Sequence, residues 1–250
     1  NPQELCLIDS FIWPFPDEEA LGALDLAIDA CVDFVKATGM PFISGKDSLS
    51  STYRGTNEII KIPPVLCVSV FGRLPDLKKT VSSDLKSAGN LLWLVGSRKP
   101  EELGGSVFYR LQNLTRTNLP QINLEHFMQT CQELHKAIQS GQVKACHDLS
   151  EGGWSAAAAE MASGCELGLK LQIQALEKPE EFLFNETAGC FLVETSPEID
   201  LSRQFSFCRL IGSVQEKTEI IVQQQGQILV QASLADLKQA WQKPLKEVFG

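Results

Sequence analysis

Residues 143–162 read VKACHDLSEGGWSAAAAEMA, and they contain a glycine loop between two segments of different character. The apolar run from Val143 to Cys146 leads into the loop, and the Ala-rich stretch from Trp154 to Ala162 indicates a helix after it. Ser150 is a residue type that caps helix N-termini, and glycines at 152 and 153 permit close backbone approach. This order of an apolar run, a loop and a helix favours a mixed α/β protein.

Apolar runs and amphipathic segments alternate along the rest of the chain as well. Short apolar runs predict strands at Leu5–Ile8, Pro41–Ser44, Val65–Phe71, Leu91–Val95, Gly189–Glu194, Cys208–Val214 and Glu219–Gln223. Longer amphipathic stretches predict helices at residues 17–39, Leu124–Ser140 and Leu234–Phe249. This mixture predicts an α/β or α+β fold.

A polar connection divides the chain into two parts. It includes Pro75 and continues through a charged, Ser-rich run to Gly89 and Asn90. We therefore expect residues 1–75 to form an incomplete α/β subdomain and residues 76–90 to be the connection. Residues 91–250 are then expected to form a complete α/β domain.

The composition argues against several classes of protein. The 250 residues carry a net charge of −9, and no apolar run approaches the ~20 residues of a membrane span. An acidic chain is a poor ligand for nucleic acid, but backbone N–H groups and a metal ion can still hold the phosphates of a small substrate. The eight cysteines form no C-x-x-C pair, which favours free thiols in a reducing cytoplasm. We expect a cytoplasmic protein with no membrane or nucleic-acid partner.

The tetrapeptide Gly45–Ser48 (GKDS) follows a predicted strand and is predicted to lie in a loop. A glycine there lets backbone N–H groups approach an anion closely. Lys46 suits phosphate neutralisation, Asp47 suits Mg²⁺, and Ser48 suits a hydrogen bond to a phosphate oxygen. The alternative is a plain turn, because the P-loop pattern also needs an upstream glycine that this sequence lacks.

The loop at residues 147–153 (HDLSEGG) is the second candidate site. Asp148 offers the hard oxygen ligand that Mg²⁺ prefers, and the two glycines allow a phosphate to approach the backbone at a helix N-terminus. The alternative is a simple helix start with Ser150 as its N-cap. That alternative explains Ser150 well, but it does not explain the aspartate and the glycine pair.

Two further segments are weaker candidates. Phe184–Thr187 (FNET) ends an apolar run with Glu186, which is either a metal or substrate contact or part of a solvated turn; taken alone, the turn is favoured. Gly104–Ser106 is another glycine-containing stretch, and its simplest interpretation is a loop before Val107–Leu111.

Taken together and in order, these segments resemble one family, the phosphoribosylformylglycinamidine synthases of the AIR-synthase-related superfamily. The chain looks like the second AIR-synthase-like repeat of such an enzyme. The matching segments are 41–50 (PFISGKDSLS), 102–106 (ELGGS), 147–153 (HDLSEGG), 184–187 (FNET) and 210–213 (LIGS). The GKDS and HDLSEGG signatures are far more specific together than either is alone.

The resemblance implies a fold and a reaction. The implied fold is a partial AIR-synthase-like N-terminal subdomain followed by a three-layer α/β/α C-terminal domain. The implied enzyme is a ligase of purine biosynthesis that uses Mg²⁺ and converts formylglycinamide ribonucleotide, ATP and glutamine-derived ammonia to the amidine, ADP and phosphate. The implied partners are nucleotide substrates, the remaining synthase repeats and a glutaminase domain or subunit. Because the family's catalytic His lies in an earlier repeat, we expect this chain, which begins at Asn1, to be a fragment that is inactive alone.

The resemblance also implies roles for residues near the N-terminus. Gly45 and Asp9 would contact ATP or ADP, and Ser48 would contact the substrate. Lys46 stands where some relatives have an Asn that helps to hold Mg²⁺. Since a lysine cannot ligate Mg²⁺, Lys46 is expected to contact the substrate, and Asp47 is expected to take the place of the metal ligand.

The same resemblance implies that Asp148 binds the metal and Ser150 the phosphates of an auxiliary nucleotide, which in some large forms of the enzyme is structural and is not turned over. Two alternative functions stay open. One is a non-catalytic, nucleotide-binding structural subunit, and the other is a phosphotransferase of the same superfamily. The GKDS form favours the synthase over the phosphotransferase.

Overall fold

The computed structural model describes residues 4–115 and 118–249 of the chain. The chain divides into two compact units, Asn1–Leu77 and Lys78–Gly250. This division lies inside the predicted connection at residues 76–90. Each unit is described by itself below.

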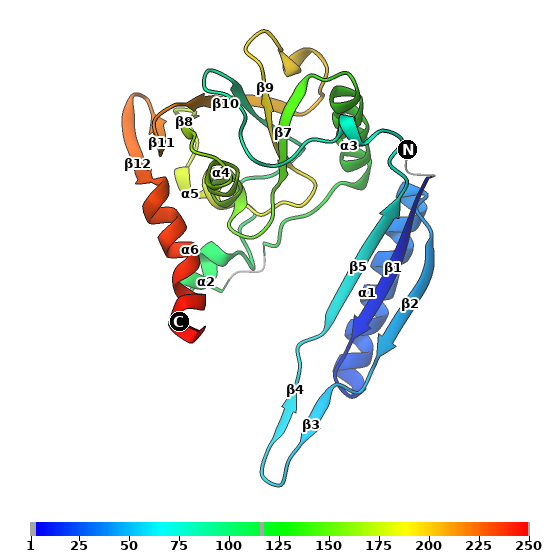
Figure 1. The fold of residues 1–250 in the computed structure, drawn as a ribbon. Helices are drawn as coiled ribbons and strands as arrows, with labels where there is room; N and C mark the ends of the chain where they lie inside the picture. The colour runs from blue at the N-terminus through cyan, green and yellow to red at the C-terminus, as the bar shows by residue number, and fades with distance from the viewer. Residues whose placement is uncertain (1–3, 116–117, 250) are drawn as a thin grey trace. The chain divides into compact units, whose positions relative to one another are not determined.

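The first unit is a three-stranded sheet with one long helix along one face (Figure 1). The strand order is β2-β1-β5, with β2 parallel and β5 antiparallel to β1. A small hairpin of two further strands connects β2 to β5. The elements are β1 (Leu5–Ile12), α1 (Glu18–Thr38), β2 (Phe42–Ser48), β3 (Thr52–Arg54), β4 (Ile59–Lys61) and β5 (Val65–Gly72).

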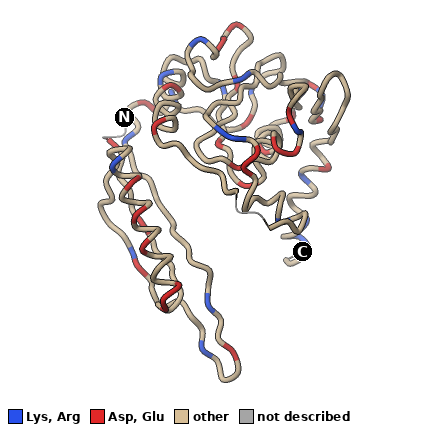
Figure 2. Tube along the Cα trace, turned by 180° about the vertical axis from the view of Figure 1, so that it is seen from behind, with Lys and Arg blue, Asp and Glu red and all other residues tan. Residues whose placement is uncertain are grey.

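Local signals define both ends of helix α1, as the sequence predicts. Asp17 is the N-cap, and its side chain accepts a hydrogen bond of 2.9 Å from the Ala20 N–H. Gly39 ends the helix with a φ of 73°, a left-handed conformation that glycine adopts without strain. Figure 2 shows acidic residues spaced along α1. The face that packs on the sheet is apolar and contacts Phe11 and Trp13.

The second unit contains a seven-stranded sheet in the order β12-β11-β8-β10-β6-β9-β7. All neighbouring strands are antiparallel except β8 and β11, which are parallel. The strands are β6 (Leu91–Val95), β7 (Val143–Asp148), β8 (Gly168–Ile173), β9 (Phe191–Thr195), β10 (Cys208–Gln215), β11 (Glu219–Gln224) and β12 (Gln227–Ser233).

Helices cover both faces of this sheet, so the second unit has three layers (Figure 1). On one face, α4 (Gly153–Ser163), α5 (Pro179–Phe184) and the first residues of α6 (Leu234–Phe249) build a core around the fully buried Trp154. On the other face, α3 (Leu124–Gln139) packs against Trp93 and Val193. The expected α/β/α layering is therefore confirmed. The remaining short helical segments are η2 (Leu77–Lys79), α2 (Val107–Leu111) and η3 (Leu201–Arg203).

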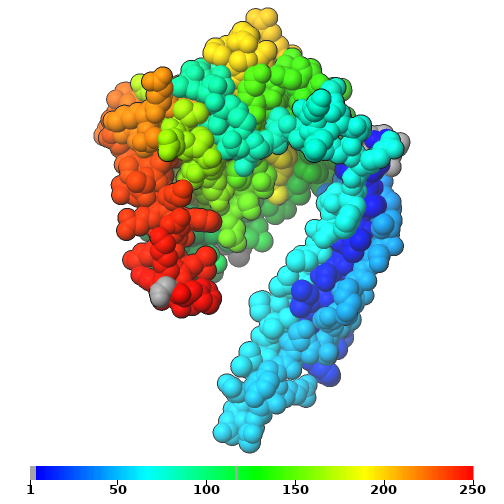
Figure 3. Space-filling model, in the orientation of Figure 1, coloured from blue at the N-terminus to red at the C-terminus, as the bar shows by residue number. Residues whose placement is uncertain are grey.

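The last helix, α6, has the bounds that the sequence predicts, and Pro244 lies inside it. Only Leu234 of this helix is buried, and Trp241 and Leu245 are exposed. Figure 3 shows the helix, in red, at the surface of the second unit. Among the residues that the structure describes, no helix combines the length and the apolarity needed to cross a membrane. All eight cysteines are free thiols, as predicted.

Candidate functional site

The GKDS tetrapeptide forms the second half of strand β2, so the prediction of a loop at this position is wrong. Gly45 pairs with Asp9 of β1, Lys46 with Ser10, and Asp47 with Phe11. Pairing with a strand some 35 residues earlier holds the backbone extended, although the tetrapeptide itself has no strand-like apolar pattern. An extended, paired backbone does not form the turn that would surround an anion with N–H groups.

The register places Asp9 and Gly45 in direct contact. A Cβ at position 45 would lie 2.4–2.6 Å from the carboxylate atoms of Asp9, so the Asp9 side chain occupies the space that any other residue would fill. Within the described part of the chain, this carboxylate accepts no hydrogen bond and is free to accept one from a ligand. The structure therefore brings together the two residues expected to contact a nucleotide.

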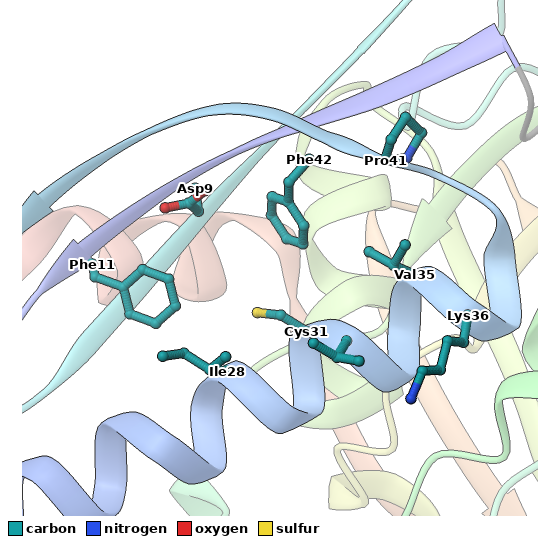
Figure 4. Close-up of a pocket in the computed structure, with 9 residues that line it drawn as sticks. Asp9, Phe11, Ile28, Cys31, Val35, Lys36, Pro41 and Phe42 are labelled. Carbon is teal, nitrogen blue, oxygen red and sulfur yellow. The ribbon is translucent and has the colours of Figure 1, made fainter.

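A pocket of about 470 Å³ lies beside this pair, between the sheet and α1. Figure 4 shows Asp9 and Phe11 of β1 and Phe42 of β2 on the side of the sheet that faces Cys31 and Val35 of α1. Burial raises the pKa of the Cys31 thiol, and the nearby Asp9 carboxylate raises it further. The residues that line the pocket are apolar apart from Asp9 and Lys36, and its volume lies in the range of small-molecule sites.

Lys46 and Ser48 lie on the opposite face of β2. Successive side chains of a strand alternate between faces, so Gly45 and Asp47 share the α1 side while Lys46 and Ser48 point away from it. The Lys46 ammonium donates to Ser48 Oγ at 3.0 Å and to the Asp47 carbonyl at 3.0 Å. Because β2 is an edge strand among the described residues, a ligand lying along this edge can reach both faces.

The second candidate site follows strand β7. Asp148 is the last residue of this strand, and 67% of its side chain is exposed. Its carboxylate lies 3.5 Å from His147 Nδ1, and His147 Nε2 lies 3.2 Å from Glu160 Oε2 of α4. The strand thus presents an accessible carboxylate beside an imidazole that is held in place from its other nitrogen.

Ser150 is exposed and does not cap the helix, so the prediction of a Ser150 N-cap is wrong. The N-cap of α4 is Gly152, with a φ of 81°, and no side chain accepts a hydrogen bond in the capping position. The following residue, Gly153, also has a positive φ, of 65°. With the two glycines in these conformations, α4 begins at Gly153, two residues later than a Ser150 N-cap would give. That hydroxyl has no hydrogen-bond partner within the described part of the chain and is available to a ligand.

The FNET segment at 184–187 is partly buried and hydrogen-bonded to neighbouring loops, so the favoured interpretation as a solvated turn is wrong. Asn185 is completely buried, and its amide donates to the carbonyls of Lys99 at 3.0 Å and Glu102 at 2.8 Å. Glu186 Oε1 accepts hydrogen bonds from the N–H groups of Val107 and Gly152. The one sequence signal for this role was a carboxylate and an amide at the end of an apolar run.

The carboxylates near these segments do not form a closed metal cage. In residues 4–115 and 118–249, no group of three or more His, Cys, Asp or Glu side chains is arranged to hold a metal ion. Mg²⁺ commonly keeps several waters and binds one or two carboxylates together with the phosphates of its substrate. The exposed carboxylate of Asp148 fits that arrangement. The carboxylate of Asp47, which is also exposed, fits it as well.

The sequence matches the family described as "AIR synthase related protein, C-terminal domain" over residues 87–224, more than half of the chain. The chain belongs to the AIR synthase related family. The matched region covers all of the seven-stranded sheet except β12, together with the 147–153 loop and Glu186.

Two relatives of this AIR synthase related chain are PurL subunits of phosphoribosylformylglycinamidine synthase. It is 30% identical over 244 residues to a phosphoribosylformylglycinamidine synthase subunit PurL from Thermococcus sibiricus, covering 94% of this chain and 33% of the relative. It is 30% identical over 200 residues to the PurL subunit of Pyrococcus furiosus, covering 79% of this chain and 27% of the relative. The chain thus spans about a third of the length of the curated relatives it matches.

Solved structures support the AIR synthase related fold. A structure of T. maritima PurL complexed with FGAR superposes with a TM-score of 0.69 at 19% identity, covering 93% of this chain and 39% of that one. E. coli HypE, a hydrogenase maturation protein, superposes with a TM-score of 0.64 at 17% identity, covering 89% of this chain and 71% of that one. At these identities the likeness concerns the fold.

Proposed function

We propose that this chain is a repeat of a phosphoribosylformylglycinamidine synthase. The proposed ligase converts formylglycinamide ribonucleotide, ATP and glutamine-derived ammonia to the amidine, ADP and phosphate. The observation that carries the proposal is the extent of the similarity to PurL, which covers 94% of this chain and therefore includes both units. The match to the AIR synthase related domain lies entirely outside the first unit. That match alone therefore does not distinguish the synthase from other members of the superfamily.

The first unit supports contacts to a nucleotide through Asp9 and Gly45. The free carboxylate of Asp9 can accept hydrogen bonds from hydroxyl or amino groups, and Gly45 leaves room for it against the backbone. The adjacent apolar pocket suits a flat ring system. Structures of T. maritima PurL complexed with ATP and with ADP support the choice of ATP and ADP as the ligands.

The other face of β2 supports contacts to an anionic substrate. Lys46 and Ser48 already share a hydrogen bond, so an ammonium and a hydroxyl are presented together. These are the groups that bind phosphate oxygens, and formylglycinamide ribonucleotide carries a phosphate. We assign Ser48 and Lys46 to this substrate. Asp47 remains the proposed metal contact of this strand.

The second unit supports binding of a nucleotide with Mg²⁺ through Asp148 and Ser150. Asp148 would hold the metal ion and Ser150 a phosphate oxygen, since both side chains are exposed at the end of β7. When bound, Mg²⁺ neutralises phosphate charge. The contribution of this chain is the position of the two side chains.

The proposed partners are the remaining synthase repeats and a glutaminase domain or subunit that supplies ammonia. Two observations support them: the chain spans a third of a PurL subunit, and a solved structure of PurLQS from Thermotoga maritima superposes with a TM-score of 0.66. We place the protein in the cytoplasm, since eight free thiols suit a reducing compartment.

The full-length protein that carries this chain is expected to form the amidine when supplied with formylglycinamide ribonucleotide, Mg-ATP and ammonium. The 250-residue chain alone is expected to form none, because the family's catalytic His is expected in another repeat. Mass spectrometry of the product and an assay of released phosphate measure both. Nucleotide binding without turnover by the full-length protein would instead favour the non-catalytic alternative.

In the same full-length protein, Asp148→Asn is expected to weaken Mg-ADP binding by about 1–3 kcal/mol, the contribution of a hydrogen bond or contact to a charged group. The change is nearly isosteric and the side chain is exposed, so the fold should persist. Calorimetric titration with Mg-ADP measures the loss, and nucleotide that co-purifies with the protein gives a second measure. A bound nucleotide should also raise the melting temperature of the wild type more than that of the variant.

Glu151→Gln is the matched control, because it removes the same charge from the same exposed loop. It is expected to bind Mg-ADP as the wild type does. Equal affinity in Asp148→Asn and the wild type would remove Asp148 from the site, whatever the result of the synthase assay.

A further inference from the structure

One carboxylate oxygen links two glycine loops of the second unit. Glu186 Oε1 accepts the N–H of Val107 at 2.9 Å and the N–H of Gly152 at 2.8 Å. Val107 is the first residue of α2 and directly follows the 102–106 loop, and Gly152 is the N-cap of α4. Both nitrogens therefore lie within reach of the same atom, although they are 45 residues apart in the chain.

The neighbours of Glu186 hold it at this place. The amide of the buried Asn185 donates to the carbonyls of Lys99 and Glu102, and the Thr187 hydroxyl donates to Asn185 Oδ1 at 2.7 Å. A Cβ at Gly153 would lie 2.8 Å from the Asn185 carbonyl oxygen, so the backbones of these two segments are in contact. The Glu186 side chain thus starts from a backbone that is fixed to both loops.

Helix α5, which ends next to this segment, is fixed from its other side. The Arg98 guanidinium donates to the Phe182 carbonyl at 2.9 Å and lies 4.8 Å from the centre of the Phe182 ring. Arg209 lies 4.1 Å from the centre of the same ring. These contacts limit the movement available to residues 182–186. Glu186 therefore cannot easily move with one loop so as to break its hydrogen bond to the other.

The Gly152 N–H is consequently unavailable to a phosphate. A negative group near a helix N-terminus is stabilised by the helix dipole and the free N–H groups, and Glu186 provides such a group from within the protein. A nucleotide phosphate at the 147–153 loop can instead use the hydroxyl of Ser150, which lies two residues earlier and is exposed. The position of Ser150 depends on where Gly152 is held.

We propose that Glu186 is a positioning residue that couples the 102–106 loop to the 147–153 loop and thereby sets the place of Ser150 and Asp148. It does so through Oε1 without touching the ligand. The effect on nucleotide binding rests on the proposed function, but the coupling of the two loops does not.

The test compares Glu186→Ala and Glu186→Gln with the wild type in the full-length protein. Hydrogen exchange is followed in peptides covering residues 104–110 and 150–156. Glu186→Ala is expected to speed exchange about tenfold in both peptides, because both N–H groups lose one shared acceptor. Glu186→Gln keeps an amide oxygen at the same place and is expected to stay within about threefold of the wild type. Glu180→Ala, which removes an exposed carboxylate from the preceding helix α5, should leave both peptides unchanged.

Two further measurements separate positioning from a general loss of stability. Formate is small enough to occupy the space left by the Glu186 carboxylate, and it is expected to slow exchange in both peptides of Glu186→Ala and in neither peptide of Glu180→Ala. The dissociation constant for Mg-ADP should rise about tenfold in Glu186→Ala and recover in Glu186→Gln. Rescue by the conservative variant is the outcome that a merely structural loss would not give.

Faster exchange in only one of the two peptides, or in neither, overturns the coupling. If Glu186→Ala does not fold, Glu186→Asp replaces it, since a carboxylate one methylene shorter cannot keep both bonds; wild-type protection of both loops in that variant also overturns the proposal. Coupled exchange in a wild-type protein that binds no Mg-ADP would leave the coupling intact and contradict the proposed function instead.

Discussion

Replacing Gly153 with alanine is expected to destabilise the second unit by about 3 kcal/mol or more. Gly153 has a φ of 65°, which costs an alanine about 1 kcal/mol relative to glycine. The added Cβ would also lie 2.7 Å from the Leu183 carbonyl oxygen and 2.8 Å from that of Asn185. These are backbone atoms that cannot rotate away. Either α4 or residues 183–185 must move, and both movements disturb the hydrogen bonds of Glu186.

Gly141→Ala is the matched control for this prediction. Gly141 has a φ of 75°, but no atom lies within 4 Å of the position that its Cβ would take. It should therefore cost only the conformational part, about 1 kcal/mol. Urea denaturation of both variants measures the two costs. Equal costs would show that residues 183–185 yield to the added methyl group.

Elements with local signals could be predicted from the sequence. The bounds of α1 follow from the Asp17 cap and the left-handed Gly39, and those of α3 from helical periodicity ending near Ser140. Strands β5 and β6 are continuous apolar runs, which can be recognised without knowing their partner strands. Of the two, β6 is buried and β5 is mostly exposed. The three-layer arrangement of the second unit followed from the family resemblance.

Edge strands and short elements could not be predicted in the same way. The last strand, β12, has mostly exposed residues and two glutamines, so it lacks the apolar character of a buried strand. The GKDS half of β2 is extended because it pairs with β1, and nothing within the four residues indicates that pairing. Helix α5 has only six residues, too few to show a helical period.

The residues of the candidate site also divide into those that the sequence could predict and those that it could not. The resemblance named Asp9 and Gly45 together, and the register of β1 and β2 explains why the two residues meet. The role of Glu186 was out of reach, because its two partners lie 79 and 34 residues away in the sequence. Capping by Ser150 was a reasonable local prediction, but the glycine pair moves the start of α4 past it.

Replacing Glu194 with alanine is expected to destabilise the second unit by about 3–5 kcal/mol. Glu194 is completely buried in β9. Its carboxylate accepts the N–H groups of Lys86 at 2.9 Å and Ser87 at 3.2 Å, and the amide of Asn90 at 2.7 Å. Without it, three donors lose their acceptor in a site from which water is largely excluded, and each unpaired polar group carries its full desolvation cost.

Glu133→Ala separates this effect from the loss of an ordinary carboxylate hydrogen bond. Glu133 also accepts three hydrogen bonds, from the N–H and the hydroxyl of Ser206 and from the Gln129 amide, but it does so at the surface, where water can replace it. Its removal should cost about 1 kcal/mol. Urea denaturation gives both values, and a difference below about 1 kcal/mol between the two variants would contradict the prediction. The difference should be large because residues 86–90 lead directly into β6, so the loss of Glu194 frees the start of a central strand of the sheet.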